Sequence, residues 1–172
     1  EQVNTGGVTL SVFELMTATF AADDFLLRED WECRKERLSD EKFKVISEFD
    51  STSFLTAVTL LTSFEKSLLD GNAVSCKRKD VLNLKLQSYV TNAPRIEEGL
   101  HKAARFLVGL KIFDARSLPY TTQIIPLSAI CAFLERRFEL EPVRKRLAQW
   151  YWCGVFGELY GGANETRMAS DL

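Results

Sequence analysis

The residue types that most often carry catalysis or bind metals are scarce in this sequence. His101 is the only histidine, and the four cysteines, Cys33, Cys76, Cys131 and Cys153, are widely spaced with no Cys-x-x-Cys pair. A zinc site needs several closely spaced nitrogen or sulfur ligands, so the sequence predicts no metal site. We expect all four cysteines to be reduced thiols that pack as small apolar side chains.

The single histidine has charged residues around it and no obvious catalytic partner. His101 lies four residues from both Glu97 and Arg105, which is the pattern of a charge ladder on a helix surface. Histidine suits proton transfer near neutral pH, but no nucleophile is marked beside it. The sequence therefore predicts no catalytic residue. A freestanding enzyme would instead require a deep polar pocket that holds His101 or Glu158 together with Arg167.

A glycine-containing segment near the start, Asn4-Thr5-Gly6-Gly7, precedes a strong helix start. The backbone N–H groups of such a turn, together with the amino end of the next helix, can hold phosphate oxygens. The segment lacks the spacing and lysine of a P-loop and the G-x-G-x-x-G of a dinucleotide fold. A tight turn that leads into a helix is the alternative interpretation.

Three short basic clusters are candidates for contacts with nucleic acid: Lys77-Arg78-Lys79, Arg136-Arg137 and Arg144-Lys145-Arg146. Such clusters contact phosphates when they converge on one surface. The chain has 22 lysine and arginine residues against 24 aspartate and glutamate residues, a net charge of −2. That balance gives no general attraction to nucleic acid, so solvated helix faces are the alternative. The candidate DNA contacts are Lys77, Arg78, Lys79 and Arg144.

An aromatic run, Trp150-Tyr151-Trp152, lies near the end of the sequence. Its rings could stack on nucleic acid bases. Leu147 and Phe156 lie at helical spacing from the run, however, so a core position or a protein interface is the stronger interpretation.

Helical periodicity and helix-capping residues dominate the sequence, and no segment alternates apolar and polar residues for long enough to predict a strand. Ser11 with Glu14 fits a capping box, and Asp50 is a good helix cap. Ser39-Asp40 is expected to break the second helix. The expected helices cover about residues 12–22, 27–46, 50–70, 79–83, 92 to the break at 118–119, 124–138 and 141–161.

The length and composition indicate one helical domain. The 172 residues are 46% hydrophobic, which suits a single core, and no apolar run approaches the ~20 residues of a membrane-spanning helix. We predict an all-α fold, an irregular bundle of about seven helices over residues 1–172. The start carries no secretory signal, so we expect a cytoplasmic location. With no initiator methionine, the chain is expected to be excised from a longer protein, with residues 1–10 as a linker.

Four segments of the chain together resemble one large bacterial family. They are the segment Asn4-Thr-Gly-Gly-Val-Thr-Leu-Ser-Val-Phe-Glu14, the segment Ser75-Cys-Lys-Arg-Lys-Asp80, the segment Ala103-Ala-Arg-Phe-Leu107, and the run from Trp150 to Arg167. The family consists of domain-of-unknown-function proteins related to the S component of the GmrSD modification-dependent restriction endonuclease. The resemblance extends over essentially the whole chain.

This resemblance implies a parent protein with chemistry that the present chain lacks. In the family, an N-terminal ParB/sulfiredoxin-like domain carries an Asp-Gly-Gln-Gln-Arg motif associated with nucleotide hydrolysis, and some members continue into an HNH-type nuclease domain. Carried over by position, Asn4, Gly6 and Gly7 would lie near the nucleotide. The Asp-Gly-Gln-Gln-Arg motif is absent here, and one histidine cannot supply a His-Asn-His arrangement.

The resemblance therefore implies a non-catalytic helical domain of an NTP-dependent restriction or phage-defence protein, serving as a scaffold and as a DNA contact. No cofactor is expected in this chain, whereas the parent would use an NTP with a divalent metal. The expected partners are the ParB-like domain, an HNH-type nuclease domain and DNA, with no membrane. The alternative is a protein–protein interaction module that docks a nuclease domain or a second subunit through the aromatic helix 143–160.

Overall fold

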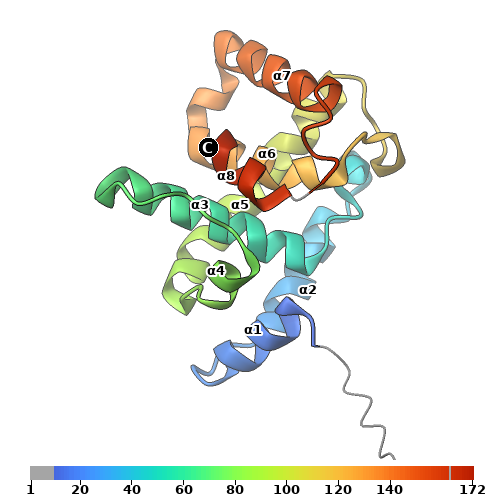
Figure 1. Ribbon diagram of the computed structural model, residues 1–172. Helices are drawn as coiled ribbons and strands as arrows, with labels where there is room; N and C mark the ends of the chain where they lie inside the picture. Colours follow the sequence, from blue (N-terminus) through green and yellow to red (C-terminus); the bar gives the residue numbers. More distant parts are fainter. Residues whose placement is uncertain (1–9, 163) are drawn as a thin grey trace, which may run out of the picture.

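The computed structural model describes residues 10–162 and 164–172, and every regular element in these residues is a helix (Figure 1). The α-helices are α1 (Val12–Ala21), α2 (Leu27–Leu38), α3 (Ser51–Asp70), α4 (Arg78–Leu82), α5 (Leu86–Gly109), α6 (Ile124–Leu134), α7 (Glu141–Phe156) and α8 (Asn164–Asp171). Short 3-10 helices are η1 (Glu41–Ile46), η2 (Ala115–Ser117), η3 (Thr121–Gln123) and η4 (Glu135–Glu139). The predicted all-α, irregular bundle is confirmed.

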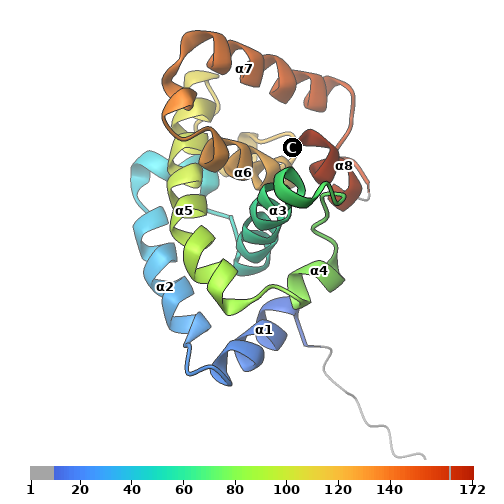
Figure 2. The same ribbon diagram turned by 90° about the vertical axis from the view of Figure 1, so that its left-hand side faces the viewer.

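The long helix α5 is the centre of the bundle, and it packs against α6, α3 and η1. Figures 1 and 2 show α1 and α4 at one end of the molecule and α7 crossing the other end. The predicted apolar stripe of α5, Ile96, Leu100, Ala103 and Leu107, is fully buried. Helix α6 is apolar nearly all round and has eight buried residues among its 11, so it lies within the bundle as its sequence predicts.

The two central helices approach so closely that their backbones touch. A Cβ atom at Gly99 of α5 would collide with the Ser128 carbonyl oxygen of α6 and would lie 3.1 Å from the Ala132 Cβ. Ser128 and Ala132 are themselves small and buried. Glycine facing small residues lets the helix axes come together without leaving a void. The α5–α6 contact therefore depends on the absence of a side chain at Gly99.

A buried ion-pair network joins α2 to α5. Arg34 Nη1 and Arg37 Nε each donate to the Glu97 carboxylate at 2.5 Å. Arg34 also donates to Asp30 at 2.7 Å, and the Tyr89 hydroxyl donates to Asp30 at 2.5 Å. Burial opposes ionisation of Glu97, but the hydrogen bonds and positive charges of the two arginines outweigh it and hold the pKa of Glu97 below its usual value. The network fixes α2 against the central helix.

Several predicted helix boundaries are wrong, including the end of α5 at Gly109 rather than near residue 118 and the end of α6 at Leu134 rather than at residue 138. Helix α5 begins at Leu86, not near residue 92, and Pro94 lies inside it. Proline leaves the carbonyl of Val90 without its helical N–H partner, and Val90 is at the surface, where water can reach it. The first turn is held by Tyr89, whose ring packs 5.5 Å from that of Phe20. Tertiary packing therefore stabilises the helical turns that precede Pro94.

The predicted end of α7 is also wrong. The glycines at 161–162 were expected to end this helix, but α7 ends at Phe156. Glu158 has a φ of 52°, and the Leu159 N–H donates to the Gly154 carbonyl at 3.1 Å. This turn ends the helix before the predicted glycines, because the following Tyr160 is buried and must return to the bundle.

We expect the substitution Gly99→Ala to lower the free energy of unfolding by about 1–3 kcal/mol, because the new methyl group forces α5 and α6 apart. Gly109→Ala, in the same helix, is the matched control, since its Cβ would meet only an Arg144 Nη2 atom at 3.7 Å. This control should be neutral or slightly stabilising. Chemical denaturation of both variants measures the difference, and equal effects would contradict the close helix contact.

We expect Glu97→Gln to cost about 1–3 kcal/mol at neutral pH, because buried Arg34 loses one of its two counter-charges and keeps Asp30. The pKa of Glu97 is lower in the folded protein than in the unfolded chain. Its stabilising contribution is therefore present above the unfolded pKa and is lost as the pH falls through the folded pKa. Denaturation between about pH 3 and 7 should show a flatter acid dependence for Glu97→Gln. The exposed neighbour Glu98→Gln should behave like wild type.

Candidate functional site

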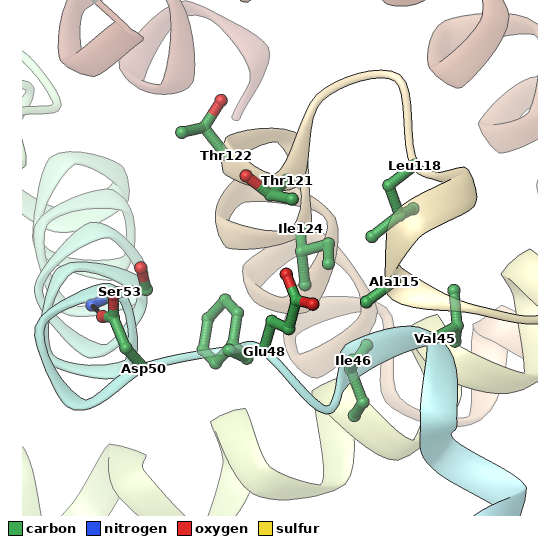
Figure 3. A pocket seen from close by; sticks show the side chains of 11 residues that line it. Val45, Ile46, Glu48, Asp50, Ser53, Ala115, Leu118, Thr121, Thr122 and Ile124 are labelled. Carbon is green, nitrogen blue, oxygen red and sulfur yellow. Dashed lines mark hydrogen bonds between the residues drawn. The ribbon is translucent and has the colours of Figure 1, made fainter.

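Two adjoining hollows lie at the amino end of α3 and share the side chains of Ser53 and Thr122. The smaller, which we call the Glu48 pocket, has a volume of about 160 Å³. Figure 3 shows the carboxylate of Glu48 pointing into this pocket. Apolar side chains such as Ile46 and Ile124 form much of its wall. Of the two carboxylates in its lining, Glu48 faces the pocket and Asp50 is engaged as the cap of α3, so this small pocket has no evident catalytic chemistry.

The larger hollow has a volume of about 470 Å³, and we call it the amino-end hollow. It brings together residues from the beginning, the middle and the end of the chain. Its lining consists of Val12, Thr52, Ser53, Thr56, Cys76, Arg78, Val81, Thr122, Ile125, Gly162, Asn164, Glu165 and Met168.

Residues at the starts of several helices line this hollow. Val12, Arg78 and Asn164 are the first residues of α1, α4 and α8, and Thr52 is the second residue of α3. The N–H groups of a helix's first turn carry partial positive charge. Arg78 adds a full positive charge, and Glu165 is the carboxylate in the lining. The arrangement suits a negatively charged group that also accepts hydrogen bonds.

Some of the polar groups in the hollow are already engaged. Asp50 caps α3 by accepting from the Ser53 N–H at 2.7 Å. Asn164 Nδ2 donates to the Thr122 hydroxyl at 3.4 Å, while the buried Asn164 Oδ1 has no partner among the described residues. Burial raises the pKa of the Cys76 thiol to about 12, so this cysteine is neutral and a poor nucleophile near pH 7. The hollow is equipped for binding more than for covalent chemistry.

The structure separates the predicted DNA contacts into two places. Lys77, Arg78 and Lys79 are exposed around the start of α4, and only Arg78 lines the amino-end hollow. Arg144 is also exposed but lies on α7, at the opposite end of the bundle in both views (Figures 1 and 2), with its guanidinium 5.9 Å from the Phe138 ring. These four residues do not form one continuous basic surface.

The predicted nucleotide-proximal residues Asn4, Gly6 and Gly7 lie outside the described residues. They immediately precede α1, whose first residue lines the amino-end hollow. Of the groups that a freestanding enzyme would use, Glu158 and Arg167 line neither hollow, and Arg167 is bound to Asp171 at 2.6 Å.

The surface charge ladder expected around His101 is wrong in one respect. Glu97 is buried in the network with Arg34 and Arg37, not on the surface. His101 Nδ1 lies 3.8 Å from Glu98, and its ring stacks on that of Phe43 at a centroid distance of 4.4 Å. These contacts place His101 in the packing between α5 and η1.

The hydroxyl groups of the amino-end hollow were missed in the sequence. Ser51-Thr52-Ser53 follows Asp50 and was interpreted only as part of a helix cap. Thr122 and Asn164 had no role assigned to them. The available signal was weak, because nothing in the sequence shows that residues more than 40 positions apart meet. Within residues 10–162 and 164–172, no group of three or more histidine, cysteine, aspartate or glutamate side chains could hold a metal ion.

Comparison with known proteins gives a distant similarity and no function. The chain is 26% identical over 186 residues to an uncharacterized protein of Methanocaldococcus jannaschii. The alignment covers the whole of this chain and only 28% of the relative. The chain therefore spans little more than a quarter of that relative's length. No protein family description matches the chain. No solved structure matches it either. In the part of the chain that the structure describes, no helix has the length and apolar character needed to cross a membrane.

We expect two of the four thiols to react with an alkylating reagent and the other two to be protected. Cys33 and Cys153 are exposed, contrary to the expectation that all four cysteines pack as apolar side chains. Cys76 and Cys131 are buried, and burial raises the pKa of each to about 12. Brief treatment with iodoacetamide at pH 7.5, followed by peptide mass spectrometry, should modify only the exposed pair. In denaturant all four thiols should react. If Cys76 in the native protein were modified as fast as Cys33, that result would contradict the burial of Cys76 in the wall of the hollow.

Proposed function

We propose that this chain is the helical domain of an NTP-dependent restriction or phage-defence protein of the family related to the S component of GmrSD. In this role it is a non-catalytic, cytoplasmic scaffold. The amino-end hollow faces the nucleotide-handling ParB/sulfiredoxin-like domain, and the parent protein binds the NTP with a divalent metal. An HNH-type nuclease domain and DNA are the further partners.

The convergence of separate segments at the amino-end hollow carries this proposal. Three of the four segments on which the family resemblance rests contribute to the lining: Val12 from 4–14, Cys76 and Arg78 from 75–80, and Asn164 and Glu165 from 150–167. These segments are far apart in the chain and share no helix. Their meeting at one hollow is expected if they cooperate in a single contact. The fourth segment, 103–107, belongs to α5 and is largely buried in the core.

The electrostatics of the hollow support a role next to a nucleotide. Helix amino ends and Arg78 favour negatively charged groups, and the hydroxyls of Thr52, Ser53 and Thr122 offer hydrogen bonds. A hollow of about 470 Å³ is large enough to receive a loop or a phosphate group presented by a neighbouring domain. The exposed Lys77 and Lys79 beside it are the candidate DNA contacts of the scaffold.

The proposal predicts different behaviour of the isolated chain and of the longer protein. The isolated chain should neither hydrolyse NTPs nor cleave DNA. The open reading frame that encodes it should carry an Asp-Gly-Gln-Gln-Arg motif upstream in a mixed α/β segment, and the longer protein should hydrolyse an NTP. Arg78→Glu should lower that rate about tenfold or more, because it reverses the charge of the hollow. Lys79→Glu, which changes the adjacent exposed cation outside the lining, should leave the rate unchanged.

Three results would contradict this proposal. The first is an open reading frame without such an upstream segment. The second is robust, metal-dependent turnover by the isolated chain that is lost on mutation of a named residue. The third is a longer protein whose NTP hydrolysis is the same with Arg78→Glu as with Lys79→Glu. Circular dichroism of both variants establishes that the helical fold is retained.

A further inference from the structure

A third hollow, chemically different from the Glu48 pocket and the amino-end hollow, lies against α7. We call it the α7 hollow, and its volume is about 380 Å³. It lies between α6, α7, the end of α8 and the second half of α3. Its walls are mainly aliphatic and aromatic side chains: Phe64, Ile130, Phe133, Leu134, Leu147 and Trp150. All of these except Leu147 are only half-buried, so apolar surface remains open in a concave place.

Helix α7 forms one wall of this hollow and is loosely embedded in the bundle. Only three of its 16 residues are buried, Leu147, Tyr151 and Gly154. Trp150 faces the hollow and is half-buried, whereas its neighbour Tyr151 packs into the core at 6.2 Å from the Phe106 ring. Two rings of the aromatic run are thus separated, Trp150 at the α7 hollow and Tyr151 in the core.

The rim of the α7 hollow is positively charged. Arg146 belongs to the lining, and the Arg137 guanidinium lies 5.3 Å from the centroid of the Phe133 ring, which is part of the wall. Neither arginine forms an ion pair with any residue that the structure describes. Asp171 is the carboxylate side chain in the lining, and Arg167 already pairs with it at 2.6 Å. The charge available to a ligand is therefore positive.

We propose that the α7 hollow binds an acidic amphipathic helix of a partner protein. Its apolar side chains would cover Phe64, Phe133 and Trp150, and its carboxylates would meet Arg137 and Arg146. A groove between helices with apolar walls and a basic rim is the complement of such a helix. Nucleic acid would satisfy the two arginines but would leave the apolar walls in contact with water. This inference is independent of the nucleotide role proposed for the amino-end hollow.

Selection from an unbiased library of displayed 16-residue peptides, with the full chain as bait, tests this inference. Selected peptides should combine leucine or phenylalanine at three- and four-residue spacing with glutamate or aspartate on the flanks. A synthetic copy of the most enriched peptide, labelled with fluorescein, is then titrated by anisotropy. Arg146→Glu should weaken its binding about tenfold, because it replaces attraction by repulsion at the rim. Lys145→Glu, the adjacent exposed residue outside the lining, should have little effect.

Any other occupant of the α7 hollow would give a result that contradicts the proposal. Enrichment of basic peptides, or no enrichment, overturns the proposal, as does equal binding by the Arg146→Glu and Lys145→Glu variants. Displacement of the labelled peptide by decanoate indicates a small amphiphile as the ligand. Displacement by a 20-base-pair DNA duplex indicates nucleic acid. Concentration-dependent dimers that Arg146→Glu abolishes, measured by sedimentation, indicate a second copy of this chain. Any of these three outcomes also overturns it.

Discussion

The backbone contact between α5 and α6 at Gly99 sets the geometry on which the other elements depend. With no side chain at Gly99, the Ser128 carbonyl lies against the α5 backbone, and buried Ala132 packs beside it. This close approach lets α6, which has almost no polar face, lie within the bundle while α3 packs on both helices. A larger residue at this point would separate the two helices to which α3, η1, η3 and α8 attach. This close contact therefore sets the position of the helices that pack directly on α5 and α6.

Ion pairs as well as apolar contacts attach helix α2 to the bundle. Helix α2 is densely charged and could not be held by apolar contacts alone, since only its Leu27, Trp31 and Leu38 give apolar burial. The pairing of Arg34 with Glu97 attaches it to α5, and the partners are specific because each buried charge requires the other. A network of this kind gives one register for α2 against the central helix.

The amino-end hollow and the α7 hollow lie at different places along α3 and differ in character. The first turns of α3 contribute hydroxyls to the amino-end hollow, and Phe64, farther along the same helix, contributes to the apolar α7 hollow. Helix α6 passes between them, with Ile125 in one lining and Ile130 in the other. The amino-end hollow mixes hydroxyl, charged and apolar side chains near the starts of several helices, whereas the α7 hollow is apolar with a basic rim.

The local parts of the fold were accessible from the sequence because they depend on residues within four positions of each other. The capping box of Ser11 and Glu14, the Asp50 cap, the break at Ser39-Asp40 and the buried stripe of α5 all follow from such short-range interactions. The all-α class follows from the same periodicity. The sequence also supplied the candidate Arg78, although its placement in the lining of a hollow was not evident.

Long-range contacts decided the rest. Packing of Tyr89 on Phe20 extends α5 through Pro94, and Glu97 becomes buried only because Arg34 arrives from α2. Val12, Arg78 and Asn164 share a hollow because three helix starts meet there, which no spacing in the chain reveals. The sequence by itself determined which segments are helical and the side-chain caps of α1, η1 and α3. The tertiary structure alone decided which charges are buried and which surfaces remain open, because burial depends on residues distant in sequence.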